Sequence, residues 1–258
     1  MSRCRLRELG VLAPLACVGV ACGAFGETDV PARDGNAGGG AQDDAAALDG
    51  GASGSIGDAL PRLDGACIPS APGFAEAFDS AWEQRWVRQG GIDVDPAVGH
   101  ASAPSLLVDI PANPVARWAE RAIGLPCHTR AEAQINFNAI GAGDIDVLGI
   151  EDGLPASRGV LVMVRGANLV AEYPTGASNV GQVALSATPL HDWYRIALEV
   201  DLPARTWTIS FAAVTKTGPL PADWPATDTL LLKVGASWVS NVTSPWTFHL
   251  DGVAFSSP

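Results

Sequence analysis

The residues with the clearest potential for chemistry lie between positions 143 and 151. Asp144 and Asp146 are two positions apart, so on a β-strand they would share one face. Carboxylates gathered in this way could cleave a glycosidic bond, if about 5 Å separated them, or could help to bind calcium. Strict alternation places Glu151 on the opposite face, where it does not complete a catalytic pair. We therefore expect Asp144 and Asp146 to belong to a ligand face or to a solvated strand edge.

The other residues with chemical potential are dispersed along the chain. The four histidines show no metal-ligand spacing, and we expect each of them at the surface or in a turn: His100, His128, His191 and His249. No G-x-S-x-G motif marks a serine nucleophile. Calcium would need further oxygen ligands beside the two aspartates. From the sequence we predict no catalytic residue, no metal site and no cofactor.

Tryptophan is the residue type best suited to sugar binding here, because an indole face covers the apolar face of a pyranose ring. Four tryptophans could serve in this way: Trp118, Trp224, Trp238 and Trp246. Most tryptophans of a β-sandwich belong to its core, so these positions have two interpretations. We assign Trp118 and Trp238, together with Asp144 and Asp146, to a candidate ligand face.

The overall charge limits the possible partners. The 258 residues include 16 Lys and Arg against 28 Asp and Glu, which gives a net charge of -12. A chain of this kind lacks the basic surface that binding a phosphate backbone requires. We exclude nucleic acid as a partner.

The N-terminus reads as an export signal. Arg3, Arg5 and Arg7 precede an uncharged, apolar stretch over residues 9–21. As a helix, this stretch would rise about 20 Å, less than the roughly 30 Å of a bilayer core. We therefore expect residues 1–21 to be a signal peptide rather than a membrane span.

The run Val-Ala-Cys-Gly at positions 20–23 resembles the lipobox of bacterial lipoproteins, although Gly19 stands where that family prefers Leu, Val or Ile. The resemblance implies that Cys22 becomes the lipidated first residue and that only this anchor contacts the membrane. Gly23 is not the aspartate of inner-membrane lipoproteins, which favours the outer membrane of a Gram-negative bacterium. Cys17 and an ordinary cleavage near Ala24 are the alternatives.

Two cysteines remain for the body of the protein once Cys4 and Cys17 leave with the signal and Cys22 takes the lipid. Cys67 and Cys127 can then form one disulfide. Closing a loop of about 60 residues would stabilise the fold by roughly 4 kcal/mol in an oxidising compartment. The alternative is two unrelated buried thiols.

Between the lipobox and Cys67 the composition cannot form a core. Residues 23–66 contain 11 Gly, 10 Ala and 8 acidic residues, with Phe25 as the single aromatic residue. Such a segment buries too little apolar surface to offset its loss of conformational entropy. We expect residues 22–66 to be a disordered linker and residues 67–258 to be the folded domain.

Within that domain, hydrophobic residues alternate with polar ones, as in half-buried strands. The pattern predicts a hairpin from 193–201 and 206–214, with Gly252 at a bulge in the last strand. Residues 74–79 favour a strand, and 80–85 fit either a strand or a helix. Further strands are predicted at 106–110, 133–138, 160–164, 169–173, 181–187, 230–234 and 246–251. Many short strands without crossover helices indicate an all-β fold, an antiparallel two-sheet sandwich.

This strand series resembles the concanavalin A-like lectin and glucanase jelly roll, a group that includes laminin-G-type domains. The resemblance is carried by Phe74, Phe78-Asp79, Trp82 and Trp86, by the run 99–106, by the 193–214 hairpin and by Leu-Asp-Gly-Val at 250–253. It implies a concave sheet face that binds carbohydrate in many members. The hydrolytic members use E-x-D-x-x-E or E-x-D-x-E on one strand, which the stretch 143–151 does not reproduce.

Three functions follow from these observations. The first is a lipid-anchored module that binds a polysaccharide or a surface partner without cleaving it. The second is a secreted glycoside hydrolase or polysaccharide lyase that uses Asp144, Asp146 or Glu172. The third is a structural envelope protein without a small ligand.

Overall fold

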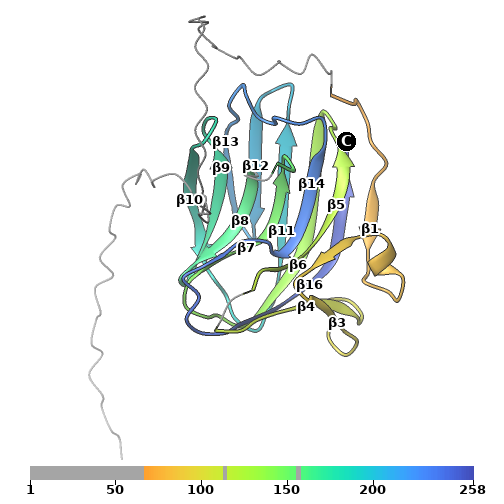
Figure 1. Cartoon of the computed structure of the whole chain (residues 1–258), viewed down its shortest axis with the longest axis vertical. Helices are drawn as coiled ribbons and strands as arrows, with labels where there is room; N and C mark the ends of the chain where they lie inside the picture. The colour runs from red at the N-terminus through yellow and green to blue at the C-terminus, as the bar shows by residue number, and fades with distance from the viewer. Residues whose placement is uncertain (1–66, 113–114, 155–157) are drawn as a thin grey trace, which may run out of the picture.

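The computed structural model describes residues 67–258, except 113–114 and 155–157 (Figure 1). The predicted signal peptide 1–21, Cys22 and the linker 22–66 lie outside the described residues. Within the described part, the chain forms sixteen strands and one 3-10 turn, η1 (Trp82–Gln84). No helix of that part is long and apolar enough to cross a bilayer.

One sheet, which we name the β6 sheet, has the strand order β13-β12-β11-β6-β16-β4-β3, and β1 also pairs with β16. All of these pairings are antiparallel. Its strands are β1 (Phe74–Glu76), β3 (Asp93–Asp95), β4 (Ser105–Ile110), β6 (His128–Ala139), β11 (Trp193–Asp201), β12 (Thr206–Phe211), β13 (Val214–Pro219) and β16 (Trp246–Ser256).

The second sheet, the β7 sheet, has the order β10-β9-β8-β7-β14-β5-β2, and β15 also pairs with β7. Its pairings are antiparallel as well. Its strands are β2 (Val87–Gln89), β5 (Arg117–Gly124), β7 (Asp144–Glu151), β8 (Gly159–Arg165), β9 (Asn168–Pro174), β10 (Val180–Ala187), β14 (Leu230–Ala236) and β15 (Val239–Ser240).

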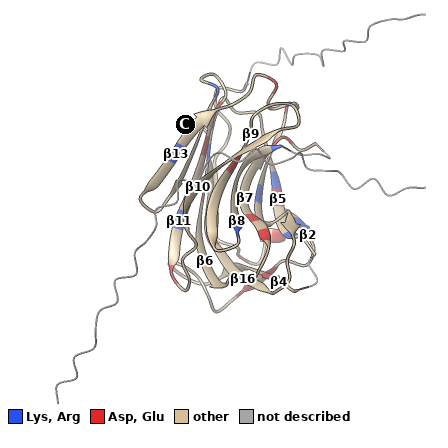
Figure 2. Ribbon diagram, turned by 90° about the vertical axis from the view of Figure 1, so that its left-hand side faces the viewer, with Lys and Arg blue, Asp and Glu red and all other residues tan. Residues whose placement is uncertain are grey.

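The two sheets pack face to face (Figure 2), and the core fills the space between them. Alternate residues of each strand point into this space, so Ile135 and Phe137 of β6 and Ile145 and Ile150 of β7 are fully buried. Trp207, Trp224 and Trp246 are among the largest fully buried side chains. The predicted all-β jelly-roll sandwich is confirmed.

The predicted hairpin is confirmed in its first part and wrong in its second. Strands β11 and β12 pair with Asp201 opposite Thr206. The second strand ends at Phe211 rather than continuing to Val214, because Ala212 turns the chain with a φ of 50°. Strand β13 then returns and pairs with β12, so this part of the fold is a three-stranded meander.

The segment 74–86 forms strand β1 and then the short turn η1. The carboxylate of Glu76 is buried, and it accepts hydrogen bonds from Arg85 Nε at 2.8 Å, Trp86 Nε1 at 3.0 Å and the Phe78 amide at 3.0 Å. Burial raises the pKa of Glu76, but the hydrogen bonds from Arg85, Trp86 and Phe78 outweigh it, so its pKa lies below the ordinary value.

A disulfide joins Cys67 to Cys127 across 60 positions of sequence, with the Cα atoms 4.8 Å apart. Cys127 lies between β5 of the β7 sheet and β6 of the β6 sheet, so the bridge fixes the start of the domain to the crossing between the sheets. At the other end of the chain, the pairing of β16 with β6 shifts between Asp251 and Ala254. Gly252 has a φ of +56° there, which confirms the predicted bulge.

Candidate functional site

The outer face of the β7 sheet carries the candidate ligand residues. On β7, Ile145, Leu148 and Ile150 point into the core. The pairing with β8 shifts between Asp146 and Leu148, so Val147 is an extra, bulged residue. The bulge changes the alternation and places Glu151 on the same outer face as Asp146. The prediction that Glu151 lies on the opposite face is therefore wrong.

Asp146 and Glu151 meet around Ser237, which follows β14. The Ser237 hydroxyl lies within hydrogen-bond distance of both carboxylates, with 3.5 Å to Glu151 Oε1. The backbone amide of Trp238 donates to Asp146 Oδ1 at 2.7 Å. Lys233 Nζ lies 3.2 Å from Glu151 Oε2. Both carboxylates are buried, and each is held by neighbouring donors.

A second polar network crosses four strands of the same face. Arg165 Nε lies 3.4 Å from the Asp144 carboxylate, and Arg165 Nη1 donates to Gln182 at 2.6 Å. The Gln182 amide then donates to Glu172 Oε2 at 2.7 Å. The chain of contacts thus runs from β7 to β8, then to β10, and from there back to β9. The Glu172 carboxylate at its end is buried. The face is therefore lined by hydrogen-bonding groups that the sheet holds in register.

Two of the four candidate tryptophans lie on this face. Trp118 of β5 is half-buried, and its indole N–H donates to Glu120 Oε2 at 3.1 Å. Trp238 is also half-buried and precedes β15, whose Ser240 is the partner of Asp144, so alternation places Trp238 on the outer side. Trp224 and Trp246 are fully buried and serve the core. The structure thus brings Asp144, Asp146, Trp118 and Trp238 to one face.

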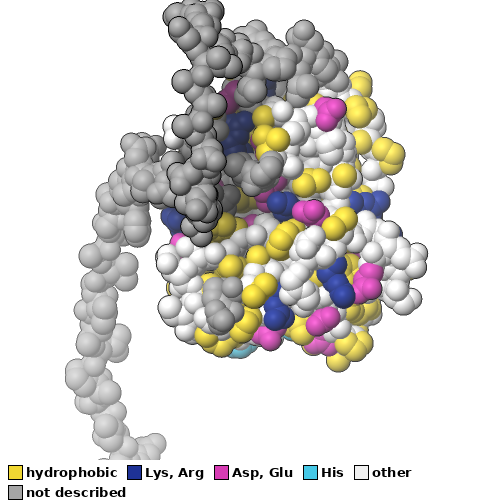
Figure 3. Space-filling view, in the orientation of Figure 1, with side chains coloured by type: hydrophobic (Ala, Val, Ile, Leu, Met, Phe, Trp, Pro, Cys, Tyr) yellow, Lys and Arg dark blue, Asp and Glu magenta, His cyan; other side chains and the backbone are white. Residues whose placement is uncertain are grey.

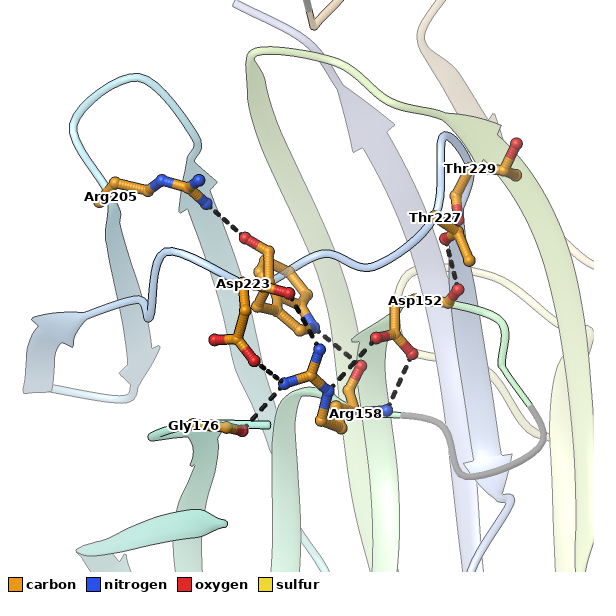
Figure 4. A network of polar contacts seen from close by, with 8 residues as sticks. Asp152, Arg158, Gly176, Arg205, Asp223, Thr227 and Thr229 are labelled. Atoms are coloured by element: carbon orange, nitrogen blue, oxygen red, sulfur yellow. Dashed lines mark hydrogen bonds and ion pairs between the residues drawn. The ribbon is translucent and has the colours of Figure 1, made fainter. Parts of the chain in front are cut away.

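The loops at one end of the face are fixed by the half-buried guanidinium of Arg158 (Figure 4). Arg158 donates to the Gly176 carbonyl and to Asp223, both at 2.9 Å, and its Nε lies 3.6 Å from Asp152. Asp152 follows Glu151 directly and is fully buried. This network holds the end of β7 in place and supports the position of Glu151.

His249 departs from the prediction that every histidine lies at the surface or in a turn. It is a buried residue of strand β16, on the outer side of the β6 sheet. Its ring lies between Asn138 Oδ1, at 2.6 Å, and Asp95 Oδ2, at 3.2 Å. Each ring nitrogen therefore lies beside a polar partner, which favours the burial of the ring. Within the described part of the chain, no group of three His, Cys, Asp or Glu could hold a metal ion.

The surface carries mixed charges. On the side turned toward the viewer in Figure 3, lysines and arginines lie singly beside acidic side chains rather than in one basic patch. In Figure 2 several charged segments lie on the layer that contains β5, β7 and β8. The titratable groups that this layer points outward are carboxylates, one lysine and one arginine, while its Tyr173 stacks on Trp207 in the core with ring centroids 4.5 Å apart.

These features define an antiparallel two-sheet β-sandwich with a polar outer face on one sheet. No protein-family profile and no curated protein sequence matches the chain. Among solved structures, the cellulose-induced protein Cip1 is similar with a TM-score of 0.54 and 13% identity, over 72% of this chain and 97% of that one. A variant of alginate lyase A1-II' is similar with a TM-score of 0.50 and 10% identity, over 68% and 96%. At identities this low, the structural similarity shows a shared fold alone.

Proposed function

We propose that this chain is an exported, lipid-anchored protein whose sandwich binds a carbohydrate on the outer face of the β7 sheet without cleaving it. The observation that carries the proposal is that Trp118 and Trp238 lie half-buried on the same face as ordered hydrogen-bonding side chains. Indole rings cover the apolar side of a sugar ring, and carboxylates and amides bind its hydroxyl groups. The two similar structures carry names that concern polysaccharides, which supports a carbohydrate-related role.

The remaining part of the proposal concerns export. The basic residues 3–7, the apolar stretch 9–21 and Cys22 support a lipoprotein signal, with the linker 22–66 as a spacer between the membrane and the domain. We expect attachment to the outer membrane of a Gram-negative envelope. Expression of the full chain with labelled palmitate tests this step: Cys22→Ser is expected to abolish the label, and Cys17→Ser is expected to keep it. Equal labelling of Cys22→Ser and the natural chain would refute the anchor.

A glycoside hydrolase is the second candidate, and one specific observation favours it. The bulge at Val147 brings Asp146 and Glu151 to the hydroxyl of Ser237. Retaining glycoside hydrolases use two neighbouring carboxyl groups, one as nucleophile and one as acid and base. Against it, Asp146 accepts a backbone amide and Glu151 is paired with Lys233, which suits a structural or binding role better than proton transfer. On this face, a lyase would have to draw its base from these carboxylates or from Lys233.

A polysaccharide array read out for both retention and new reducing ends distinguishes these functions. Retention without turnover supports the binding module, and new reducing ends support the hydrolase. Binding to no glycan would refute both and would favour a structural envelope protein.

The position of the site is tested with tryptophan variants on the two sheets. Trp118→Ala and Trp238→Ala are each expected to weaken retention on the array by about tenfold, the loss of roughly 1.4 kcal/mol of contact energy. Trp193→Ala is the matched control, because Trp193 is half-buried on the β6 sheet. Equal weakening by all three variants would show that the loss does not come from the β7 face.

A further inference from the structure

We infer that the outer face of the β7 sheet selects neutral or amino-bearing glycans and rejects polyuronates, an inference that rests on the proposed glycan binding. The described strands of this sheet point five carboxylates outward, from Glu120, Asp144, Asp146, Glu151 and Glu172. They point two cations outward, Lys233 and Arg165. A glycan on this face therefore meets an excess of negative charge.

The two outward cations are already engaged by side chains of the face. Lys233 Nζ is paired with Glu151 at 3.2 Å, and Lys233 stands opposite Glu120 in the register of β14 and β5. Arg165 lies 3.4 Å from Asp144 and donates to Gln182. A sugar carboxylate would have to displace one of these partners and would leave a protein carboxylate unpaired, which costs free energy.

The other arginines of the β7 sheet are directed away from this face. The guanidinium of Arg121 lies 3.8 Å from the centre of the Phe74 ring. Arg117 donates to the Gly91 carbonyl, and Arg88 is paired with Glu83. None of these three contacts places a positive charge on the outer face of the sheet.

Burial makes the charge selection stronger. The carboxylates of Glu151 and Glu172 are nearly inaccessible to water, with residue exposures of 4% and 5%. Charges interact more strongly where the surroundings are less polarisable than water, so a further anion beside them is penalised more than at an open surface. The more accessible carboxylates of Glu120 and Asp144 accept hydrogen bonds, and sugar hydroxyls and ammonium groups supply donors. The chemistry of the face thus fits a neutral or amino sugar.

Three β-1,4-linked hexasaccharides of matched length provide the test on the full chain: cellohexaose, a glucosamine hexamer and a mannuronate hexamer, with the polysaccharide array alongside. We expect cellohexaose or the glucosamine hexamer to bind at least about tenfold more tightly than the mannuronate hexamer. Uronate binding of equal or greater strength would overturn the inference and leave the proposed function standing. If the protein bound none of the three hexasaccharides and no polysaccharide of the array, the proposed function itself would be overturned.

Charge variants show whether the selection originates on this face. Glu151→Gln with Glu172→Gln is expected to narrow the difference between uncharged and uronate glycans, more at low salt than at high salt. Glu132→Gln with Glu199→Gln removes two charges from the β6 sheet and is expected to leave the difference unchanged. If the first pair fails to fold, Glu120→Gln, on strand β5, serves in its place. An equal effect of both pairs would assign the selection to net charge and overturn the inference.

Discussion

The outer faces of the two sheets have the same alternation of side chains, but the ion pairs across β6 and β11 are more exposed than the Lys233–Glu151 pair of the β7 sheet. On the β6 sheet, Glu132 is paired with Arg130 and Arg195, and Arg130 also meets Glu199, and all four of these side chains are partly exposed. On the β7 sheet, outward carboxylates exceed outward cations, and the carboxylates of Asp146 and Glu151 are buried. The first arrangement is a set of partly solvated ion pairs, and the second lies on the face that we propose to bind a glycan.

This difference shows that the fold does not decide where a ligand binds. Both sheets of a sandwich need one apolar face for the core, and both meet that need here. What distinguishes the outer face of the β7 sheet is the group of residues around the bulge at Val147, which gathers Asp146, Glu151, Lys233 and Ser237. The proposed function therefore depends on the residues of this face rather than on the sandwich fold.

The largest expected difference in the free energy of unfolding comes from variants that remove one cation from each face. Lys233→Met leaves Glu151 buried without its counter-charge and is expected to lower the free energy of unfolding by about 3 kcal/mol. Arg195→Met, where the side chain is 56% exposed, is expected to cost about 0.5 kcal/mol. Urea unfolding of both variants measures the difference.

A second variant shows whether the loss at Lys233 arises from the unpaired charge. Lys233→Met combined with Glu151→Leu removes both charges and is expected to restore most of the stability, because apolar side chains replace a buried ion pair at little cost. Losses of similar size for Lys233→Met and Arg195→Met would show that the two faces are equally solvated, and the comparison would fail.

A smaller effect is expected from removing one carboxylate on each face. Asp146→Ala removes the side-chain acceptor of the Trp238 amide and one of the two carboxylate acceptors of the Ser237 hydroxyl, and it is expected to cost about 2 kcal/mol. Asp109→Ala, on strand β4 of the β6 sheet, loses one exposed hydrogen bond of 3.1 Å from Thr247 and is expected to cost under about 0.5 kcal/mol. Thermal unfolding compares the two, and a larger loss for Asp109→Ala would contradict the assignment of faces.

Much of the fold was predictable because alternating hydrophobic residues determine which face of a strand is buried. Strand β5 was missed because Arg117, Glu120 and Arg121 interrupt its apolar pattern. Strand β13 was missed because it is a polar edge strand with exposed Thr215 and Thr217. Edge strands bury little, so their sequences carry a weak hydrophobic signal.

The candidate site was predictable only where local alternation was enough. Asp144 and Asp146 could be placed together because no irregularity separates them. Glu151 could not, because the bulge at Val147 depends on the pairing of β7 with β8 and leaves no mark in the sequence. The partners of His249 were equally hidden, because Asn138 and Asp95 lie 111 and 154 positions away. Contacts between distant segments decide such details.

The smallest expected effect is the loss of folding stability at acid pH that arises from Glu132 on the β6 face. Burial raises the pKa of Glu132, but hydrogen bonds from Arg195 and Arg130 outweigh it, so its pKa in the folded protein lies below the ordinary value of 4.5. A carboxyl group with a lowered pKa stabilises the fold above its unfolded pKa, and that contribution is lost as the pH falls through the folded pKa. Glu132→Gln is therefore expected to lose less stability than the natural chain when the pH drops from about 5 to about 3.

Urea unfolding at several pH values measures this slope. Glu199→Gln, on the neighbouring strand β11, removes one charge from the same face and sets the baseline for a change in net charge. Because both partners of Glu132 remain on a solvated surface, the difference in slope should be modest, and salt should reduce it further. If Glu132→Gln and the natural chain lose stability in parallel below pH 5, the paired charges of the β6 face would contribute nothing to folding.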